Sequence, residues 1–574
     1  MTSRTSFFNP ALFRKNLNRF APLWGIFLGA LLVSGPLALM TRLSETTDVA
    51  FVTRRLLVES QLEALGSVYC IFGIIYAVLC AAAVFGYLHN ARSAYMMHAF
   101  PMTRDCHFVT NTASGLAFAL LPHLASALLI ILVLGVNGLG ALIGQVFLLL
   151  AKAMLQYLCF FGMAVFCMHL TGSTVIGVLS YGAMSFIGWA LPTLILSSVV
   201  EPLFYGFYQS VLSFTFLSPV IKIMQIQSTL ASAWLYVYAV LGLLLLAAAW
   251  LHYRARHIER VGEAMVFGWA KVVFLILFTV AAGLLLGLAI FLILNGGDIR
   301  STGDVLGFTL CLLVGLFVGY FGAQMMLKRT IRVFGSKKFW LGYAAFALVT
   351  VLGIACLSSD VFGLQRRVPE VDQIAYAEVC TVPKNENNQI LQYDRTDNIV
   401  IRDAEGIATV TKLHAAALQE RGSEEQQNLD FSNSSDVYIV YHLKNGGKMT
   451  RHYTVTSPEA MQYGRQLFSN PEYAAAYYEK NLPKDYYAVY LIDPDGSYYE
   501  TNATEQEVRA AILRDVEAGR LPVSNNFCYN SGDWTMEIQL NNGPVFGIGI
   551  PESATELRSL FTQTDFTDYD YEGK

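Results

Sequence analysis

The sequence predicts a polytopic α-helical membrane protein that ends in a soluble α+β domain. Of its 574 residues, 54% are hydrophobic and only 14% are charged, compared with about 25% charged residues in average soluble domains. Residues 1–364 contain 21 Lys and Arg against 11 Asp and Glu, a net charge of +10, whereas residues 365–574 contain 18 against 32, a net charge of −14. This asymmetry indicates two environments. Because phosphate binding depends on Lys and Arg, we expect no nucleic-acid partner for the acidic part.

Nine stretches of the first part are long and apolar enough to cross a bilayer, which takes roughly 20 residues of helix. They are expected near residues 21–41, 67–88, 112–136, 146–168, 173–199, 232–251, 272–295, 305–327 and 340–358. Before them, residues 1–20 form a basic amphipathic segment that is expected to lie on the membrane lipid. The ninth stretch is the weakest candidate for a membrane span, because it is short and contains Gly342, Thr350 and Gly353.

The orientation follows from the basic residues in the connections, because Lys and Arg favour the cytoplasmic side. With the N-terminus inside, the inner connections contain 15 Lys and Arg and the outer connections contain 5. We therefore expect a cytoplasmic N-terminus. An odd number of spans then places the acidic domain, residues 365–574, on the extracytoplasmic side.

The connection at residues 89–111 contains a break that should form a bent protrusion. Pro101 cannot continue a helix and restricts Phe100 before it, so a short helix is expected to end there. Thr103 can then cap a new helix. Before the break, four apolar residues share one helical face: Tyr95, Met96, Ala99 and Phe100. A short helix, a proline and a restarted helix make a stiff elbow that another protein can push.

This elbow resembles the loop after the second membrane helix in permeases of the type-2 ABC exporter class. Those loops have an Arg-Ser start, a Leu or Phe before a proline, and an Arg three residues after it. The matching residues are Arg92, Ser93, Phe100, Pro101 and Arg104. Ala99 departs from the family, which usually has Ser before the Leu.

A second match, residues 256–264, resembles the family's Arg-x-x-Glu-x-Ala-Gly segment after the sixth helix. Arg256, Glu259 and Gly262 fit this pattern, and Val261 replaces the usual Ala. Together with the helix spacing, the resemblance covers residues 1 to about 364.

The resemblance implies a six-span permease core over residues 21–271, with residues 89–111 as the cytoplasmic coupling segment and three additional spans over residues 272–358. It implies the permease subunit of an ATP-driven exporter in a bacterial plasma membrane, paired with a second permease subunit, the same or related. Separate ABC ATPase subunits would bind ATP and Mg²⁺. The residues expected to couple to the ATPase are Arg92, Tyr95, Phe100, Pro101, Arg104, Glu259 and Gly262. For Arg92, Arg104 and Glu259 the alternative is a solvated charge near the membrane.

The chain itself is not expected to be an enzyme. It has no Gly-x-x-x-x-Gly-Lys-Ser/Thr loop for nucleotide phosphates, no His-Glu-x-x-His and no Cys-x-x-Cys, so we expect no catalytic residue, cofactor or metal site in this chain. Ionisable groups at membrane depth are functional candidates. Those considered for a translocation path are Lys152, Gln156, His123 and Glu201. Alternatively, Lys152 extends to the outer interface and His123 is hydrogen-bonded between helices.

The outer segment 200–231 is rich in aromatic residues, which predicts either short re-entrant helices, as in the family, or an aromatic belt at the headgroups. The acidic domain, residues 365–574, shows three hairpin signals at residues 437–455, 487–501 and 536–550. Helices are expected after them near 458–468, 505–518 and 554–561. The pattern predicts an internally repeated α+β domain of three hairpin–helix units, in one lobe or two. Cys380 and Cys528 could form a disulfide outside the membrane or remain two free thiols.

Two other functions fit the same pattern. A membrane-anchored sensor could use the acidic domain to bind an extracellular peptide or envelope component. An intramembrane enzyme would need a nucleophile or paired carboxylates at helix depth, for which Lys152 and His123 are thin support. A gene for a P-loop ATPase beside this one would favour the transporter.

Overall fold

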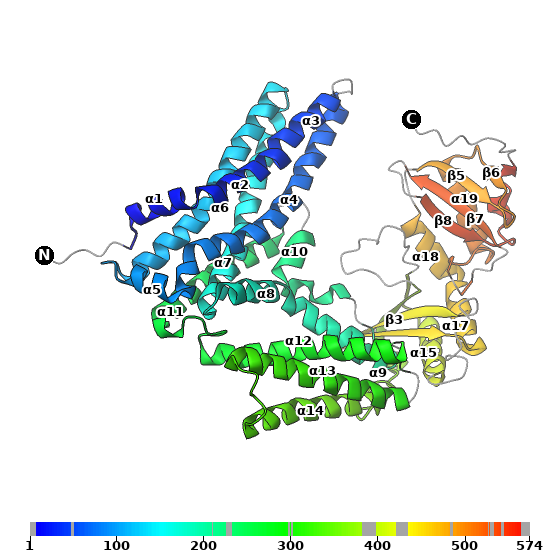
Figure 1. Ribbon diagram of the computed structural model, residues 1–574. Helices are drawn as coiled ribbons and strands as arrows, with labels where there is room; N and C mark the ends of the chain where they lie inside the picture. The colour runs from blue at the N-terminus through cyan, green and yellow to red at the C-terminus, as the bar shows by residue number, and fades with distance from the viewer. Residues whose placement is uncertain are drawn as a thin grey trace. The chain divides into compact units, whose positions relative to one another are not determined.

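The computed structural model describes residues 7–46, 51–208, 211–225, 232–296, 299, 302–381, 398–420, 434–482, 486–525, 527–528, 533–540 and 545–563. These form two units. The first comprises Met1–Ile195, Ser213–Ile293 and Leu310–Leu348, and the second comprises Leu196–Leu212, Leu294–Thr309 and Val349–Lys574. The first unit is helical, and the second contains two antiparallel sheets with helices (Figure 1).

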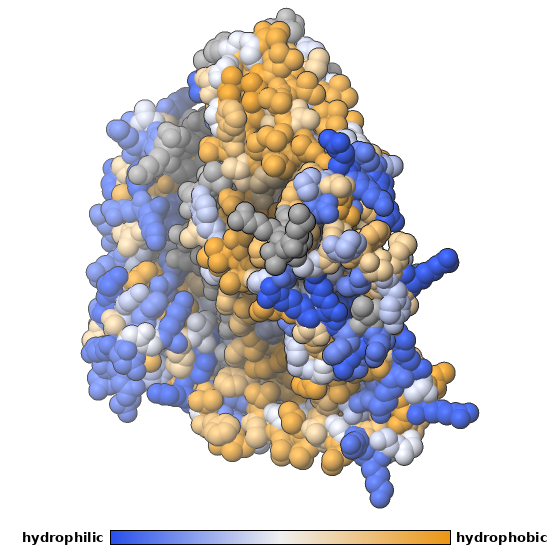
Figure 2. Space-filling view, turned by 90° about the vertical axis from the view of Figure 1, so that its left-hand side faces the viewer, coloured by the Kyte–Doolittle hydropathy of each residue, from blue (hydrophilic) through white to orange (hydrophobic). Residues whose placement is uncertain are grey.

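Within the described residues, nine helices are long and apolar enough to cross a membrane. They coincide with the nine predicted stretches, which is compatible with a multi-pass membrane protein. Many large apolar side chains of these helices are exposed, among them Leu128, Leu132 and Val136, and Figure 2 shows broad apolar areas on one face. Exposed apolar surface of this extent marks a protein or membrane contact.

The helices of this part of the chain are α1 (Pro10–Arg19), α2 (Ala21–Leu32), η1 (Val33–Leu37), α3 (Ala38–Glu45), α4 (Phe51–Phe85), η2 (Gly86–His89), α5 (Ala91–His98), α6 (Arg104–Val136), η3 (Gly140–Leu142), α7 (Ile143–Leu170), α8 (Thr174–Ile195), α11 (Ala233–Ala255), η6 (Ile258–Arg260), α12 (Gly268–Asn295), α13 (Thr302–Lys328) and α14 (Lys337–Ser358). The α1 helix starts at Asn9, whose side chain accepts a hydrogen bond from the amide of Leu12.

Helix α7 is the central helix of the first unit. Its residues Phe160, Phe161, Ala164 and Val165 are fully buried, and a helix that is apolar on all sides belongs in the interior. Its neighbours include α4 and α11. The tight packing around α7 fixes the positions of the helix ends on which the candidate site is built.

The outer segment forms two short helices, η5 (Val211–Leu217) and α10 (Pro219–Gln225). Val220 and Ile223 of α10 are buried, and Ser218 donates a hydrogen bond to the carbonyl of Ser185 in α8. This part of the segment therefore packs back onto the helices, as the re-entrant alternative requires. Its depth in a membrane stays a prediction.

The second unit contains two lobes. The first has η7 (Val371–Gln373), β1 (Ile374–Cys380), β2 (Ile399–Ile401), α15 (Ala404–Gln419), β3 (Ser435–Leu443), β4 (Lys448–Val455), α17 (Pro458–Phe468) and α18 (Pro471–Asn481). The second has β5 (Tyr486–Ile492), β6 (Tyr498–Glu500), α19 (Glu505–Glu517), β7 (Trp534–Leu540), β8 (Val545–Ile550), α20 (Thr555–Arg558) and β9 (Thr562–Gln563).

The strand orders of the two sheets match. The first sheet runs β2-β1-β3-β4 and the second β8-β7-β5-β6-β9, so β1 to β4 correspond to β5 to β8 in both order and position. The predicted hairpins are present as β3–β4, β5–β6 and β7–β8, although the turn at residues 541–543 lies outside the described residues. The three hairpins thus belong to two sheets, one in each lobe, and do not form three separate hairpin–helix units. The difference arises because β1 and β2, which pair with each other, carried no hairpin signal.

The core of the first lobe follows the alternation of its strands. Val437, Ile439 and Tyr441 of β3 are fully buried, and Tyr453 and Val455 face the same side from β4. Helix α19 of the second lobe has a capping box, because the Thr504 side chain accepts a hydrogen bond from Glu507 N and the Glu507 carboxylate accepts one from Thr504 N.

Candidate functional site

The predicted elbow is present at residues 89–104. Helix α5 begins at Asn90, whose side chain accepts a hydrogen bond from Ser93 N, and Pro101 lies in the turn that follows. Helix α6 restarts after Thr103, whose Oγ1 accepts from Cys106 N at 3.2 Å. The structure therefore confirms the short helix, the proline break and the threonine cap. The sequence reasoning missed the Asn90 cap.

The apolar face of the elbow is turned away from the other helices. Tyr95 is 57% exposed, Met96 is 60% exposed and Phe100 is 45% exposed, whereas Ala94 is buried. Arg92 and Pro101 are exposed as well. A cluster of exposed large apolar side chains on a short, capped helix has the composition of a protein contact surface.

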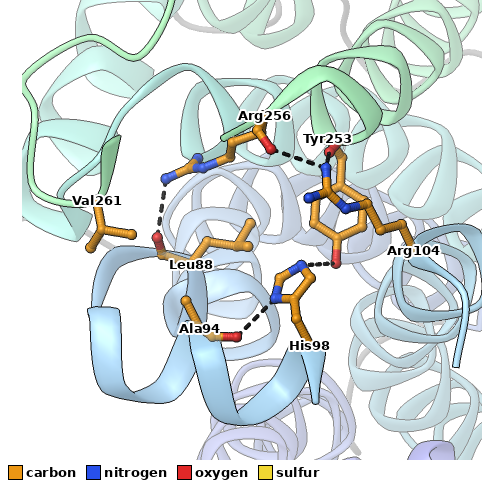
Figure 3. A pocket seen from close by; sticks show the side chains of 7 residues that line it. All are labelled: Leu88, Ala94, His98, Arg104, Tyr253, Arg256 and Val261. Carbon is orange, nitrogen blue, oxygen red and sulfur yellow. Dashed lines mark hydrogen bonds between the residues drawn. The ribbon is translucent and has the colours of Figure 1, made fainter. Parts of the chain in front are cut away.

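Arg104 points away from that exposed face and holds the end of α11. Its Nη1 lies 3.3 Å from the carbonyl oxygen of Tyr253, 2.9 Å from that of Arg254 and 3.0 Å from that of Arg256. These carbonyls end a helix and have no partner within it, so a cation at this position satisfies them and complements the helix dipole. Figure 3 shows this contact.

Asp105 strengthens the same junction. Its carboxylate accepts hydrogen bonds from Arg254 Nε at 2.8 Å and Arg254 Nη2 at 2.7 Å, which is a bidentate pair. Trp250 Nε1 donates to the same carboxylate at 2.8 Å. The first turn of α6 is thus fastened to the last turns of α11 by two consecutive residues of opposite charge.

Arg256 fastens two further helix ends. It is only 4% exposed, and its guanidinium donates to the carbonyls of Met168 and His169 at the end of α7 and of Leu88 after α4. Burial lowers the pKa of Arg256 to about 10, which leaves the guanidinium charged at neutral pH. Arg104 and Arg256, which we call the arginine anchor, therefore connect the ends of α4, α6, α7 and α11.

The two segments that carry the family resemblance meet at a small cavity beside the anchor. It is lined by Leu88, Ala94, His98, Arg104, Tyr253, Arg256 and Val261 (Figure 3). His98 bridges it, with Nδ1 2.8 Å from the carbonyl of Ala94 and Nε2 3.2 Å from the hydroxyl of Tyr253. The elbow thus rests on α11 partly through polar contacts and leaves space beside them.

The second segment is held by backbone pairing. Gly262 N donates to the carbonyl of Gly172 at 2.7 Å, and Gly172 N donates to the carbonyl of Glu263 at 2.9 Å. Gly262 has φ +87°, a conformation that favours glycine. Glu259 is exposed on η6. The structure therefore places Gly262 in a turn, and Glu259 on the surface beside it.

The residues considered for a translocation path lie in different surroundings. Lys152 is 4% exposed and its Nζ lies beside Gly66 of α4, so its side chain ends between helices; its depth in a membrane stays a prediction. Gln156, one turn later, is also buried. His123 lies between the rings of Phe27 and Tyr69 and binds the carbonyl of Ala119 in its own helix. His123 therefore packs between helices through ring contacts, whereas its hydrogen bond stays within α6 and Nε2 has no hydrogen-bond partner among the described residues.

The remaining candidates belong to the second unit. Glu201 lies within electrostatic range of His452. No disulfide joins Cys380 and Cys528: Cys380 is buried in β1, and Cys528 lies 3.6 Å from the hydroxyl of Ser469. The disulfide alternative is therefore wrong for this structure. Among the described residues, no group of His, Cys, Asp and Glu is arranged to hold a metal ion.

In the part of the chain that the structure describes, nine apolar helices are compatible with a multi-pass membrane protein, and the chain also contains a two-lobed α+β unit. Comparison of the chain with protein-family models, with curated proteins and with solved structures finds no match.

Proposed function

We propose that this chain is the permease subunit of an ATP-driven exporter of the type-2 ABC class. The observation that carries the proposal is the elbow, which presents Tyr95, Met96 and Phe100 outward while Arg104 holds its base against α11. A docking surface on one side and a rigid attachment on the other are what a lever between two proteins requires. The separate ATPase subunits would supply ATP and Mg²⁺ binding.

In this mechanism two permease subunits, identical or related, pair in a bacterial plasma membrane, with their N-termini in the cytoplasm and their acidic domains outside. Two ATPase subunits bind the elbows. ATP can shift the helices only through its different affinity for the two states of the ATPase. Movement of the elbow then passes through the arginine anchor to the ends of α4, α7 and α11, because Arg104 and Arg256 join them.

The proposal assigns different roles to residues of one motif. Met96 and Phe100 would contact the ATPase, whereas Arg104 would transmit the movement without contacting it. This separates docking from transmission within the elbow. Replacement of an exposed residue should prevent ATPase binding, and replacement of Arg104 should preserve binding but weaken coupling.

The test is co-purification of the chain with an ATPase encoded beside it, followed by ATPase assays in nanodiscs. Phe100→Glu should reduce the bound ATPase about tenfold, because a charge enters the centre of an apolar contact. The matched control is Ile331→Glu, which changes another exposed apolar residue in a connection predicted on the same side. The proposal fails if Phe100→Glu and Met96→Glu both retain the ATPase and its coupling.

A membrane-anchored sensor or binding protein for an extracellular peptide or envelope component is the second candidate. The presence of two lobes of the same strand order favours it, because ligand pockets occur preferentially where two folded parts meet. A protein that co-purifies with a kinase or regulator, and with no ATPase, would favour this function.

A further inference from the structure

Residues Phe204–Tyr208, which we call the hook, fold as part of the second unit although they follow the fifth predicted span. Helix α8 continues directly into the π-helical turn η4 (Leu196–Val200) and the short helix α9 (Glu201–Leu203). The hook comes next in the chain. It therefore connects a membrane-type helix to a domain that begins more than a hundred residues later in the sequence.

The hook is hydrogen-bonded to three parts of the second unit. The Gly206 carbonyl accepts a hydrogen bond from His452 N of the edge strand β4 at 3.2 Å. Tyr205 N donates to Gln365 Oε1 at 3.3 Å, and the Tyr205 hydroxyl donates to the carbonyl of Ala417 in α15 at 3.0 Å. An edge strand has unpaired backbone groups, so a chain segment can pair with it in this way.

Aromatic contacts surround these bonds. The Tyr205 ring lies 5.3 Å from the ring of Tyr453, and the Tyr208 ring lies edge-on to Tyr438 at 4.9 Å. On the other side, the Arg451 guanidinium lies 5.7 Å from the centre of the Phe204 ring. Contacts of this kind stabilise the docked hook beyond the area they bury.

The hook fits the lobe so closely that one position requires glycine. Gly206 has φ +78°, and a Cβ atom there would overlap the ring of Tyr453. Tyr453 is buried, and its hydroxyl lies 2.9 Å from Nε2 of His414 inside the core. The hook is thus seated directly on a core residue of the lobe.

A second attachment lies next to the first. Gln365, which accepts the hydrogen bond from Tyr205 N, donates through Nε2 to the carbonyl of Leu357 at the end of α14. Arg451 Nη2 donates to the neighbouring carbonyl of Leu364 at 2.8 Å. The hook and the chain that enters the lobe after α14 are therefore joined through one buried glutamine.

We propose that the hook is a rigid link through which the first lobe of the C-terminal unit and the end of α8 control each other's position. A change that loosens or shifts the lobe is transmitted through Gly206 and α9 to η4, and a movement of α8 is transmitted back. The π-helical turn is the element that can change, because π turns are rare interruptions that often occur at functional sites. The proposal does not depend on an ATPase.

Hydrogen exchange followed by mass spectrometry on the full chain in nanodiscs tests the link. In Gly206→Val the collision with Tyr453 should release the hook. The amides of residues 448–455 and of residues 196–203 should then exchange about tenfold faster, while β7 and β8 of the second lobe keep wild-type rates. The matched control is Gly496→Ala, because Gly496 also has a positive φ of +85° but open space around it.

A second variant approaches the link from the lobe. Val410 is fully buried in α15 and does not belong to the hook, so Val410→Ala should loosen the first lobe without changing the hook's own residues. Exchange in residues 196–203 should rise together with exchange in residues 448–455. The proposal is overturned if residues 196–203 keep wild-type exchange while residues 448–455 are opened in either variant. It is equally overturned if the amide of His452 exchanges as slowly in Gly206→Val as in the wild type.

Discussion

The first lobe of the C-terminal unit should lose stability when the pH falls below 6.5, because its core contains a histidine that must stay neutral. His414 is 0% exposed. Its Nδ1 lies 3.2 Å from the hydroxyl of Tyr441 and its Nε2 lies 2.9 Å from the hydroxyl of Tyr453. Burial, with a smaller contribution from the Arg451 charge, lowers the pKa of His414 from 6.5 to about 3.

The difference between the pKa values of His414 in the unfolded and folded chain sets the sign and size of the stability loss. Above pH 6.5 both the folded and the unfolded chain hold a neutral His414, and its burial carries no protonation penalty. Between pH 6.5 and about 3 only the unfolded chain binds the proton, so the free energy of unfolding falls as the pH is lowered. At pH 5, which is 1.5 units below the unfolded-state pKa, the loss is about 2 kcal/mol.

The assay is hydrogen exchange of the full chain at pH 7 and pH 5, corrected for the intrinsic exchange rates. Protection of β3 and β4 should fall about 30-fold between the two conditions, which corresponds to the loss of about 2 kcal/mol. The comparison variant is His414→Gln, which keeps a hydrogen-bonding side chain but does not titrate. The pH-dependent loss should largely disappear in it.

The lobe contains two other histidines, which are the same in the wild type and in the variant. His442 and His452 lie beside Glu378 and Asp436, at 3.2 Å and 3.5 Å, and both remain in the variant. Only the part of the pH dependence that the substitution removes belongs to His414. An equal fall in protection in wild type and in His414→Gln would refute the reasoning.

Three further predictions concern the anchor and the cysteines. Arg256→Met should lower the free energy of unfolding of the helical unit by about 3 kcal/mol, since charged hydrogen bonds contribute roughly 1.5–3 kcal/mol each and are not additive. Thermal melting in detergent checks this. The control is the exposed Arg92→Met, which should change the free energy of unfolding by less than about 0.5 kcal/mol. If the proposed function is right, Arg104→Ala should leave ATPase binding unchanged and reduce the stimulation of ATP hydrolysis by transported substrate or lipid. Loss of ATPase binding would contradict the transmitting role proposed for Arg104. Alkylation of the unfolded chain without reductant should label both Cys380 and Cys528, and a protected pair in mass spectra would show a disulfide.

Local rules were sufficient for the elbow but not for its attachment. Pro101 and Thr103 act on their immediate neighbours, so the break and the restart of the helix could be predicted from the sequence. Arg104 binds the carbonyl of Arg254 at a helix end 150 residues later in the chain. No periodic pattern in the sequence predicts a contact between residues so far apart. The same is true of Arg256, whose burial depends on how α4 and α7 end beside it.

The hook was missed for a different reason. Its aromatic residues were interpreted as a re-entrant segment or a headgroup belt, because Phe and Tyr have the same apolar character in contact with lipid and with a protein domain. The signal that could have distinguished them was Gly206, a glycine within the aromatic run, which indicates a turn or a close contact. The first strand pair was missed because β2 has only three residues and lies far along the chain from β1.

One run of the chain, through helix α8, connects the anchor to the hook. Arg256 holds the carbonyls of Met168 and His169 at the end of α7, and Gly172, two residues after α7, is paired with Gly262. Helix α8 begins at Thr174 and leads through η4 to the hook. Coupling over such a distance requires an element with two arrangements as well as an unbroken series of contacts. Helix α8 contains Pro192, and the π-helical turn η4 follows it directly. These two interruptions of regular α-helical hydrogen bonding lie between the start of α8 and the hook. A movement delivered to the start of α8 can therefore be absorbed or passed on there, and stabilising the hook should favour passing it on.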